Sequence, residues 1–281
     1  MDYKTKVYVG AQSWLNTIGE RQYVSQMRGV LAVYELGSRY AGYYTEGSDY
    51  DYMVVYMPSA HDLLLPPTIR KQVTEIDGHK VEVKYMSIVE YVHSIEEGDL
   101  EALQMLNATA SQRLFSEIPE TVDNKQARLI NYMKELEIER EKFTYLAPEK
   151  LFRGINGRIK SGKVRMEGAV QKGNKEEAMK CAILIRYFMD LLRVLENREP
   201  IREGLTFSPI IASLIREYRG DKKEEHADMF VTTAEHLLKE DRQAILNNLK
   251  NRELPEVSVQ ALRYYALMGR LTQLLLGGYY D

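Results

Sequence analysis

The stretch from residue 36 to residue 56 reads Leu-Gly-Ser-Arg-Tyr-Ala-Gly-Tyr-Tyr-Thr-Glu-Gly-Ser-Asp-Tyr-Asp-Tyr-Met-Val-Val-Tyr and decides the expected fold of the first part of the chain. An apolar run from Val30 to Leu36 precedes it, so a buried strand would end at Gly37, where the missing Cβ lets the backbone turn. A second apolar strand is predicted from Tyr50 to Met57. The stretch therefore predicts a glycine turn and a loop that lead from one buried strand to the next.

The glycine turn has the composition of a phosphate-binding site. A phosphate can approach Gly37 closely, and the Ser38 hydroxyl would add a donor beside the free N–H groups of the turn. We expect Gly37, Ser38 and the neighbouring Arg39 to contact the phosphates of a nucleotide, and Ser48 to orient the loop. The loop tyrosines are candidates for stacking on a base; they are Tyr40, Tyr43, Tyr44 and Tyr50.

Two carboxylates stand where the second strand begins. Asp49 and Asp51 are two residues apart, so in a strand their side chains point to the same face. Two like charges this close repel each other, which favours a divalent cation between them, with Mg²⁺ as the expected ion and Mn²⁺ as a substitute. The pair therefore predicts metal-assisted transfer of a phosphoryl or nucleotidyl group.

A third carboxylate is expected on the next hairpin. Asp77-Gly78 predicts a tight turn between strands over 71–76 and 80–86. Glu82 lies between Val81 and Val83, and alternation along the strand places it on the opposite face from these valines. Glu82 is therefore expected on the same open face as the two aspartates.

The pattern Gly37-Ser38, Gly42 and Ser48-Asp49-x-Asp51, followed by apolar residues, resembles the signature of the DNA polymerase beta superfamily of nucleotidyltransferases. The third carboxylate of that superfamily is commonly aspartate, and the candidate here, Glu82, is one methylene longer. Outside the signature, the chain is similar to a bacterial and phage subfamily often found beside RNA-repair genes. The similar segments are Tyr56-Met57-Pro58, Leu63-Leu64-Leu65, Ile88 to Leu106 and Lys180 to Arg186.

The resemblance implies a Mg²⁺-dependent nucleotidyltransferase with a two-metal site, which transfers a nucleoside monophosphate from an NTP to an acceptor hydroxyl and releases pyrophosphate. Asp49, Asp51 and Glu82 would be its catalytic and metal-binding residues, and Glu82 would bind the second metal or accept the hydroxyl proton. An RNA 3′ end is the favoured acceptor, while a protein hydroxyl or a small molecule fits the same residues. The alternative is a module of this fold that binds a nucleotide or a partner without turnover.

The composition is that of a soluble globular chain. Its 281 residues are 44% apolar and carry a formal net charge of −3, which gives no general attraction to nucleic acid or anionic lipid. The single cysteine, Cys181, excludes an intramolecular disulfide, and neither a leader nor a long apolar span is found in the sequence. We therefore expect a cytoplasmic protein with no membrane partner, and the sequence leaves its oligomeric state open.

The pattern of apolar residues changes near residue 120. Residues 1–120 are expected to form a small mixed-sheet catalytic domain, and residues 121–281 an all-α helical bundle, so the predicted fold class is α+β. In the first domain we predict a helix within 11–28, an irregular connection over 58–69, and short helices over 88–95 and 99–106 with Asp99 as N-cap. The helices predicted in the second domain cover 124–143, 148–172, 174–197, 208–219, 225–249 and 256–276, with connecting turns at 202–204 and 219–221.

The helical part also holds a local excess of positive charge. Between Lys150 and Lys180, nine lysines and arginines stand against three glutamates. This stretch would hold the triphosphate or an anionic acceptor if it faces the carboxylates, and it is a solvated helix face otherwise. Lys180 and Arg186 are the candidates for nucleotide binding. They are about 240° apart around a helix, so we expect only one of them to point into the cleft.

Overall fold

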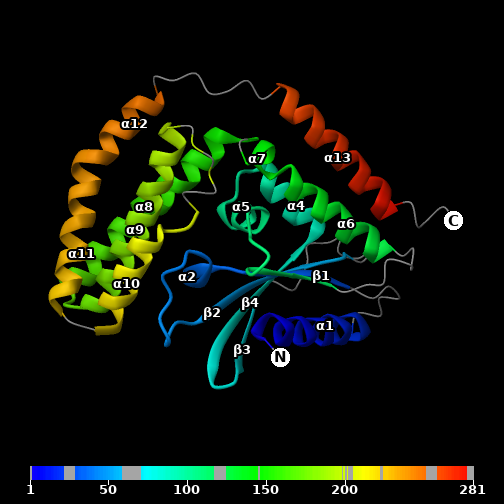
Figure 1. Cartoon of the computed structure of the whole chain (residues 1–281), viewed down its shortest axis with the longest axis horizontal. Helices are drawn as coiled ribbons and strands as arrows, with labels where there is room; N and C mark the ends of the chain where they lie inside the picture. Colours follow the sequence, from blue (N-terminus) through cyan, green and yellow to red (C-terminus); the bar gives the residue numbers. More distant parts are fainter. Residues whose placement is uncertain are drawn as a thin grey trace.

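A five-stranded sheet with helices on both faces forms the first part of the molecule, and further helices gather beyond one end of it (Figure 1). This architecture comes from a computed structural model. The described residues are 2–21, 29–58, 71–116, 125–144, 146–197, 199, 201, 205–221, 224–250 and 258–276. The fold class is α+β, as predicted.

The sheet is mixed, with the strand order β3-β4-β2-β1-β5. Its strands are β1 (Val30–Glu35), β2 (Tyr50–Tyr56), β3 (Lys71–Ile76), β4 (His79–Ser87) and β5 (Arg113–Phe115). β2 and β4 run parallel, and the other neighbouring strands run antiparallel. The predicted hairpin is confirmed, because Asp77 and Gly78 connect β3 to β4 with positive φ angles of 52° and 78°.

Each face of the sheet packs on different helices. Helix α1 (Tyr3–Arg21) covers the face that carries Tyr52, Val54 and Val83. It begins earlier than predicted because Val7 is also buried on the sheet, and residues 22–28 lie outside the described residues. The opposite face, which carries Met53 and Val55, packs on α4 (Ile88–Glu96), α5 (Leu100–Leu106) and α6 (Lys125–Ile138).

The two short helices after β4 match their predicted positions. Ser87 caps α4 with a capping box formed with Glu90, and the Asp99 carboxylate accepts a hydrogen bond from Ala102 N at the start of α5, as expected for an N-cap. The connection predicted over 58–69 falls almost entirely on residues 59–70, outside the described residues.

The second part of the described chain is helical. After α6 come α7 (Arg140–Phe143), α8 (Pro148–Gln171), α9 (Lys175–Asn197), α10 (Pro209–Asp221), α11 (Glu224–His236), the π-helical η2 (Leu237–Asp241), α12 (Arg242–Lys250) and α13 (Ser258–Leu276). Helices α8 to α12 gather beyond the end of the sheet near α2, whereas α13 runs beside α6 (Figure 1). These helices follow the predicted ranges closely.

One predicted turn is wrong. Residues 219–221 form the last turn of α10 instead of a connection, because a glycine at position 220 costs a helix only about 1 kcal/mol relative to alanine. Arg219 also anchors this turn by a hydrogen bond to the Tyr43 carbonyl. The other predicted turn, 202–204, lies outside the described residues.

Of the two apolar cores among the described residues, one lies between α1 and the sheet, and the other connects the opposite face of the sheet to the helices and extends from Leu31 in β1 to Leu275 in α13. The expected boundary near residue 120 falls within 117–124, outside the described residues, so the division into two domains stays a prediction. None of the helices that the structure describes combines enough length with enough apolar character to cross a bilayer.

Candidate active site

The glycine turn at the end of β1 brings β1 and β2 together. Gly37 begins the short helix α2 (Gly37–Tyr40) with a φ angle of +65°, a conformation that other residues rarely adopt. A Cβ at this position would lie 2.2 Å from Asp51 Oδ2. Leu36 N also donates a hydrogen bond of 2.8 Å to the Asp51 carbonyl. Only glycine therefore allows the Asp51 carboxylate to lie against the turn.

Asp51 and Glu82 are neighbours in the parallel pair of strands, where they are directly opposite in register. They point to the same face, so the prediction of a shared face is confirmed for this pair. Burial raises the pKa of Asp51, and the negative charges of Glu82 and Asp49 raise it further. The three carboxylates are thus close enough to repel each other, which is the condition that favours a bound cation.

Lysines of the β3–β4 hairpin hold the two outer carboxylates. Lys80 Nζ lies 3.0 Å from Asp49 Oδ2, and Lys71 Nζ lies 2.6 Å from Glu82 Oε2. The Asp51 carboxylate receives no hydrogen bond from the residues that the structure describes. In the described part of the chain, no three acidic, histidine or cysteine side chains are grouped as a metal site.

The oxygen donors nevertheless have the right chemistry for a hard divalent cation. Three carboxylates that repel each other beside a glycine turn would hold such an ion once Asp49 and Glu82 exchange their lysines for it. Because the described side chains do not form a metal site as they stand, binding of Mg²⁺ or Mn²⁺ would require Asp49 and Glu82 to release these lysines.

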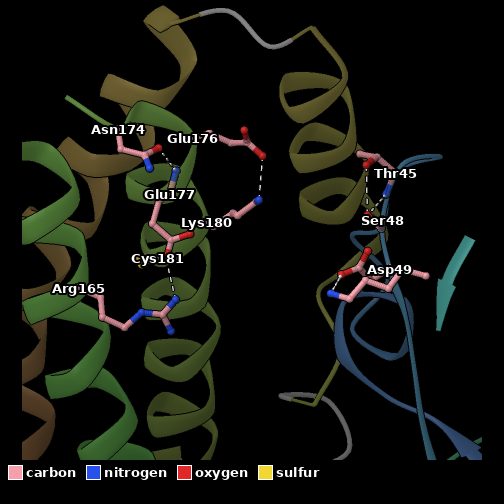
Figure 2. A network of polar contacts seen from close by, with 10 residues as sticks. Thr45, Ser48, Asp49, Arg165, Asn174, Glu176, Glu177, Lys180 and Cys181 are labelled. Carbon is pink, nitrogen blue, oxygen red and sulfur yellow. Dashed lines mark hydrogen bonds and ion pairs between the residues drawn. The ribbon is translucent and has the colours of Figure 1, made fainter. Parts of the chain in front are cut away.

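Ser48 and Arg39 shape the loop between α2 and β2. The buried Ser48 hydroxyl accepts a hydrogen bond of 2.9 Å from Thr45 N and lies 3.2 Å from Thr45 Oγ1 (Figure 2). The Arg39 guanidinium stacks between two rings, 3.5 Å from the centroid of Tyr50 and 4.6 Å from that of Tyr44. Ser48 thus orients the loop, whereas Arg39 packs on tyrosines and not in the cleft.

The same packing limits the role of the loop tyrosines. Tyr44 and Tyr50 flank Arg39, Tyr3 stacks on Tyr50 with 4.2 Å between ring centroids, and Tyr40 is buried. Of the four predicted stacking candidates, Tyr43 is the one that lines the cleft.

The cleft lies between the carboxylates and helices α5, α8, α9 and α10, and it has two compartments. The larger compartment, of about 420 Å³, is lined by residues that include Ser38, Ser48, Asp49, Arg165, Lys180 and Arg219. The smaller compartment, of about 210 Å³, is lined by residues that include Glu82, Leu100, Gln104, Arg158, Tyr187 and Phe188. Gly37, Tyr43, Asp51 and Leu184 line both compartments. Asp51 therefore lies where the compartments meet.

Three cations from three different helices line the larger compartment. Arg165 of α8 lies 2.6 Å from Glu177 Oε1, and Lys180 of α9 lies 2.8 Å from Glu176 Oε1. Figure 2 shows both on the opposite side from Thr45, Ser48 and Asp49. Arg219 of α10 donates to the Tyr43 carbonyl at 3.4 Å.

The placement of these cations separates the predicted candidates. Lys180 lines the cleft, whereas Arg186 pairs with Asp190 at 2.9 Å and lines neither compartment, so the expectation that one of the two faces the cleft is met. Arg165 belongs to the basic stretch but was not singled out within it. Arg219 had no signal in the sequence, because its approach to Tyr43 depends on how α10 packs.

Comparisons with known proteins add little to this geometry. No family model matches the sequence, and no curated protein sequence matches it. Among solved structures, the chain is similar to a nucleotidyltransferase-like protein from Exiguobacterium sibiricum, with 14% identity over 95% of this chain and 91% of that chain and a TM-score of 0.30. A TM-score this low carries no argument, so the site has to be judged on its own residues.

Proposed function

We propose that the protein is a Mg²⁺-dependent nucleotidyltransferase, which transfers a nucleoside monophosphate from an NTP to an acceptor hydroxyl. One observation carries this proposal: Asp51 lies against the Gly37 turn and opposite Glu82 in register, and Asp49 and Asp51 line one compartment together with three cations. Such a site suits a nucleoside triphosphate that binds together with a divalent cation. The carboxylates would then bind the cation, and the protein's positive side chains would bind the phosphates.

The larger compartment is the place for the triphosphate. The Gly37 turn and Ser38 contribute donors on the sheet side, and Arg165, Lys180 and Arg219 contribute positive charge on the helical side. Ion pairs already hold Arg165 and Lys180 near the compartment, and phosphate oxygens would replace Glu177 and Glu176 as their partners. This arrangement would hold the β- and γ-phosphates between the Gly37 turn and the three cations.

Asp49, Asp51 and Glu82 would hold the divalent cation. When bound, the cation neutralises charge on the triphosphate and on the departing pyrophosphate. Of the three carboxylates, Asp51 would gain most from a bound cation, because burial and the two neighbouring carboxylates disfavour its negative charge. A cation held by these residues would attract the α-phosphate to the junction of the compartments, where Asp51 lies.

The chain's own groups then serve the transfer. The acceptor hydroxyl attacks the α-phosphorus, the bond to the bridging oxygen breaks, and pyrophosphate leaves with its new charge facing Arg165, Lys180 and Arg219. Glu82 either binds the second metal or accepts the hydroxyl proton. The resemblance of the sequence to the RNA-repair-associated subfamily implies an RNA 3′ end as acceptor, whereas the chemistry of the transfer is the same for a protein hydroxyl or a small molecule, so all three acceptor classes are tested.

A second candidate function is nucleotide binding without turnover. The Lys80–Asp49 and Lys71–Glu82 pairs favour it, because these lysines occupy carboxylates that catalysis would need. In that case the nucleotide would bind in the larger compartment, and no pyrophosphate would form.

The test is incubation of the purified protein with each α-labelled NTP and Mg²⁺ or Mn²⁺, with total cellular RNA or a cell lysate as acceptor. Label transfer with pyrophosphate release in the wild-type protein, lost in Asp49→Asn and in Asp51→Asn, supports the transferase. Nucleotide binding in calorimetry without pyrophosphate release supports the binding module. Full activity in either variant would show that the site is assigned wrongly.

A further inference from the structure

We infer that the smaller compartment is the acceptor site, and that the acceptor is a small hydroxyl compound with a partly apolar body and a hydrogen-bond donor. This inference rests on the proposed function and names the class of substrate that the same site modifies. Four observations lead to it: the position of the compartment relative to Asp51, its volume, the orientation of Gln104, and the charges around it.

The position follows from the stereochemistry of transfer. In an in-line displacement, the attacking and leaving oxygens lie on opposite sides of the α-phosphorus. With pyrophosphate in the larger compartment and the α-phosphate at Asp51, the attacking hydroxyl has to come from the smaller compartment. Glu82, the carboxylate assigned to the second metal or to the hydroxyl proton, lines the smaller compartment and not the larger one.

The volume and the walls limit what can enter. At about 210 Å³, the compartment lies below the range of roughly 300 to 1,000 Å³ that is common for pockets of drug-sized ligands. Leu100, Leu184 and Phe188 give the compartment an apolar part of its lining. It therefore has room for one small body with an apolar side.

Gln104 supplies a hydrogen-bond acceptor whose orientation is fixed by its neighbours. Tyr187 Oη donates its only proton to the Leu205 carbonyl at 3.0 Å, so it can only accept from Gln104 Nε2, which lies 2.8 Å away. The amide nitrogen of Gln104 is thereby turned to Tyr187. Its Oε1 receives no hydrogen bond from any described residue, and Gln104 lines the compartment, so a ligand that donates a hydrogen bond is favoured.

The charges argue against an anionic polymer. Asp51 and Glu82 would be neutralised by the cation of the proposed function, so the other charged residues decide. Lys84 pairs with Glu101 at 2.7 Å, which leaves Arg158 as the other cation among the described lining residues.

The groove next to this compartment is also not basic. Its charged residues are Glu97, Asp99, Lys150 and Arg158, and Lys150 pairs with Glu97. Single-stranded nucleic acid needs a positively charged path for its backbone. The described residues around the smaller compartment do not form such a path, whereas an uncharged or cationic small molecule needs none.

The experiment separates the acceptor classes in one assay. A bacterial lysate is divided into total RNA, protein and a low-mass filtrate, and each fraction is incubated with the protein, the α-labelled NTPs and Mn²⁺. The expected result is label in products of the low-mass fraction, resolved by thin-layer chromatography, with release of pyrophosphate. Label only in RNA or only in protein overturns the inference and leaves the proposed function standing. No label and no pyrophosphate with any fraction overturns both.

Two variants test the site itself. Gln104→Leu is expected to raise the KM for the low-mass acceptor about fivefold, the usual effect of losing one neutral hydrogen bond, with unchanged calorimetric affinity for an α,β-methylene NTP analogue. Gln72→Leu is the matched control, because Gln72 accepts a similar hydrogen bond of 2.8 Å from Tyr85 and lines neither compartment.

Leu100→Phe, which narrows the compartment, is expected to suppress labelling while the analogue still binds, and a melting curve checks that this variant is folded. Labelling that is unchanged in both Gln104→Leu and Leu100→Phe would show that the acceptor binds elsewhere.

Discussion

The two walls of the cleft are built in different ways. On the sheet wall, neighbouring strands fix Asp51 and Glu82 in register, and the Gly37 turn presses against Asp51. On the helical wall, Arg165 and Lys180 are long side chains, 60% and 46% exposed, and each pairs with a glutamate of α9. In the proposed reaction, the sheet wall would therefore fix where the transfer takes place, whereas the helical wall would be free to adjust to the phosphates.

The two walls should also differ in their effect on the stability of the folded chain. Fixed carboxylates that repel each other reduce the stability of the folded chain, and the raised pKa of Asp51 is the sign of this cost. Exposed cations cost little and contribute little before a ligand arrives. Substitutions on the sheet wall should therefore change both activity and stability, and those on the helical wall mainly activity.

The largest effect is expected for Asp51→Asn. Loss of this carboxylate should lower transfer at least about 10³-fold, because it removes several kcal/mol of transition-state stabilisation. The melting temperature should stay equal or rise at neutral pH. Radiolabel transfer and calorimetry on the same preparation measure both quantities.

The pH dependence of stability checks the cause. Because the pKa of Asp51 is raised in the folded chain, its contribution to stability is present below the unfolded-state pKa and is lost as the pH rises through the folded-state pKa. The gain from Asp51→Asn should therefore vanish in acid. Asp49→Asn is the control: transfer should fall, but the exposed Asp49 is paired with Lys80, so the melting temperature should barely change. Equal stability gains in both variants would contradict the contrast between fixed and exposed carboxylates.

Gly37→Ala tests the contact between the turn and the strand. The positive φ angle costs a non-glycine residue about 1 to 2 kcal/mol, and the new methyl group would collide with Asp51 Oδ2. We expect a lower melting temperature together with a loss of transfer of about 10²-fold or more, because a displacement of 1 Å at a reacting centre has that effect.

Gly168→Ala is the matched control. Gly168 lies in α8 with nothing within 4 Å of an added Cβ, so this change should raise helix stability by up to about 1 kcal/mol and leave transfer unchanged. Normal activity in Gly37→Ala would mean that the turn does not position Asp51.

The sheet wall could be predicted from the sequence because its geometry is local. Gly37, Asp49 and Asp51 lie within one short stretch, and the alternation around Glu82 sets its face without knowledge of the rest of the fold. The hairpin and the N-cap Asp99 followed from turn and cap preferences for the same reason. The lysines on the carboxylates were missed, since alternation fixes the face of a side chain but not its ion-pair partner.

The helical wall could be predicted only as ranges of helix. The spacing of apolar residues locates α8, α9 and α10, but the cleft depends on how these helices pack, and Arg219 reaches Tyr43 across 176 positions of sequence. Arg39 shows the same limit. Its position beside the glycine turn predicted a phosphate contact, whereas in the structure its guanidinium stacks on two tyrosine rings.

Lys180→Met tests the helical wall. Loss of one cation near the triphosphate should raise the KM for NTP about tenfold, which corresponds to one charged hydrogen bond, with an unchanged melting temperature. Arg186→Met, on the same helix but paired with Asp190 outside the cleft, should leave the KM unchanged and lower stability slightly. An equal rise of KM in both variants would mean that net charge, and not position in the cleft, controls nucleotide binding.

The smallest effect is expected where the sheet wall itself is adjustable, at the lysines that hold its outer carboxylates. Lys80→Met and Lys71→Met each remove a competitor for Asp49 or Glu82, so Mn²⁺ should bind about two- to fivefold more tightly in calorimetry, the small size reflecting exposed ion pairs. Lys6→Met, which breaks a comparably exposed pair with Asp77 away from the cleft, controls for the loss of one positive charge. If all three variants gain the same affinity, the change is a long-range effect of charge. A gain confined to Lys80→Met and Lys71→Met would show that cation binding has to displace these lysines. The carboxylates of the sheet wall would then be fixed in position, while their ion-pair partners change when the cation binds.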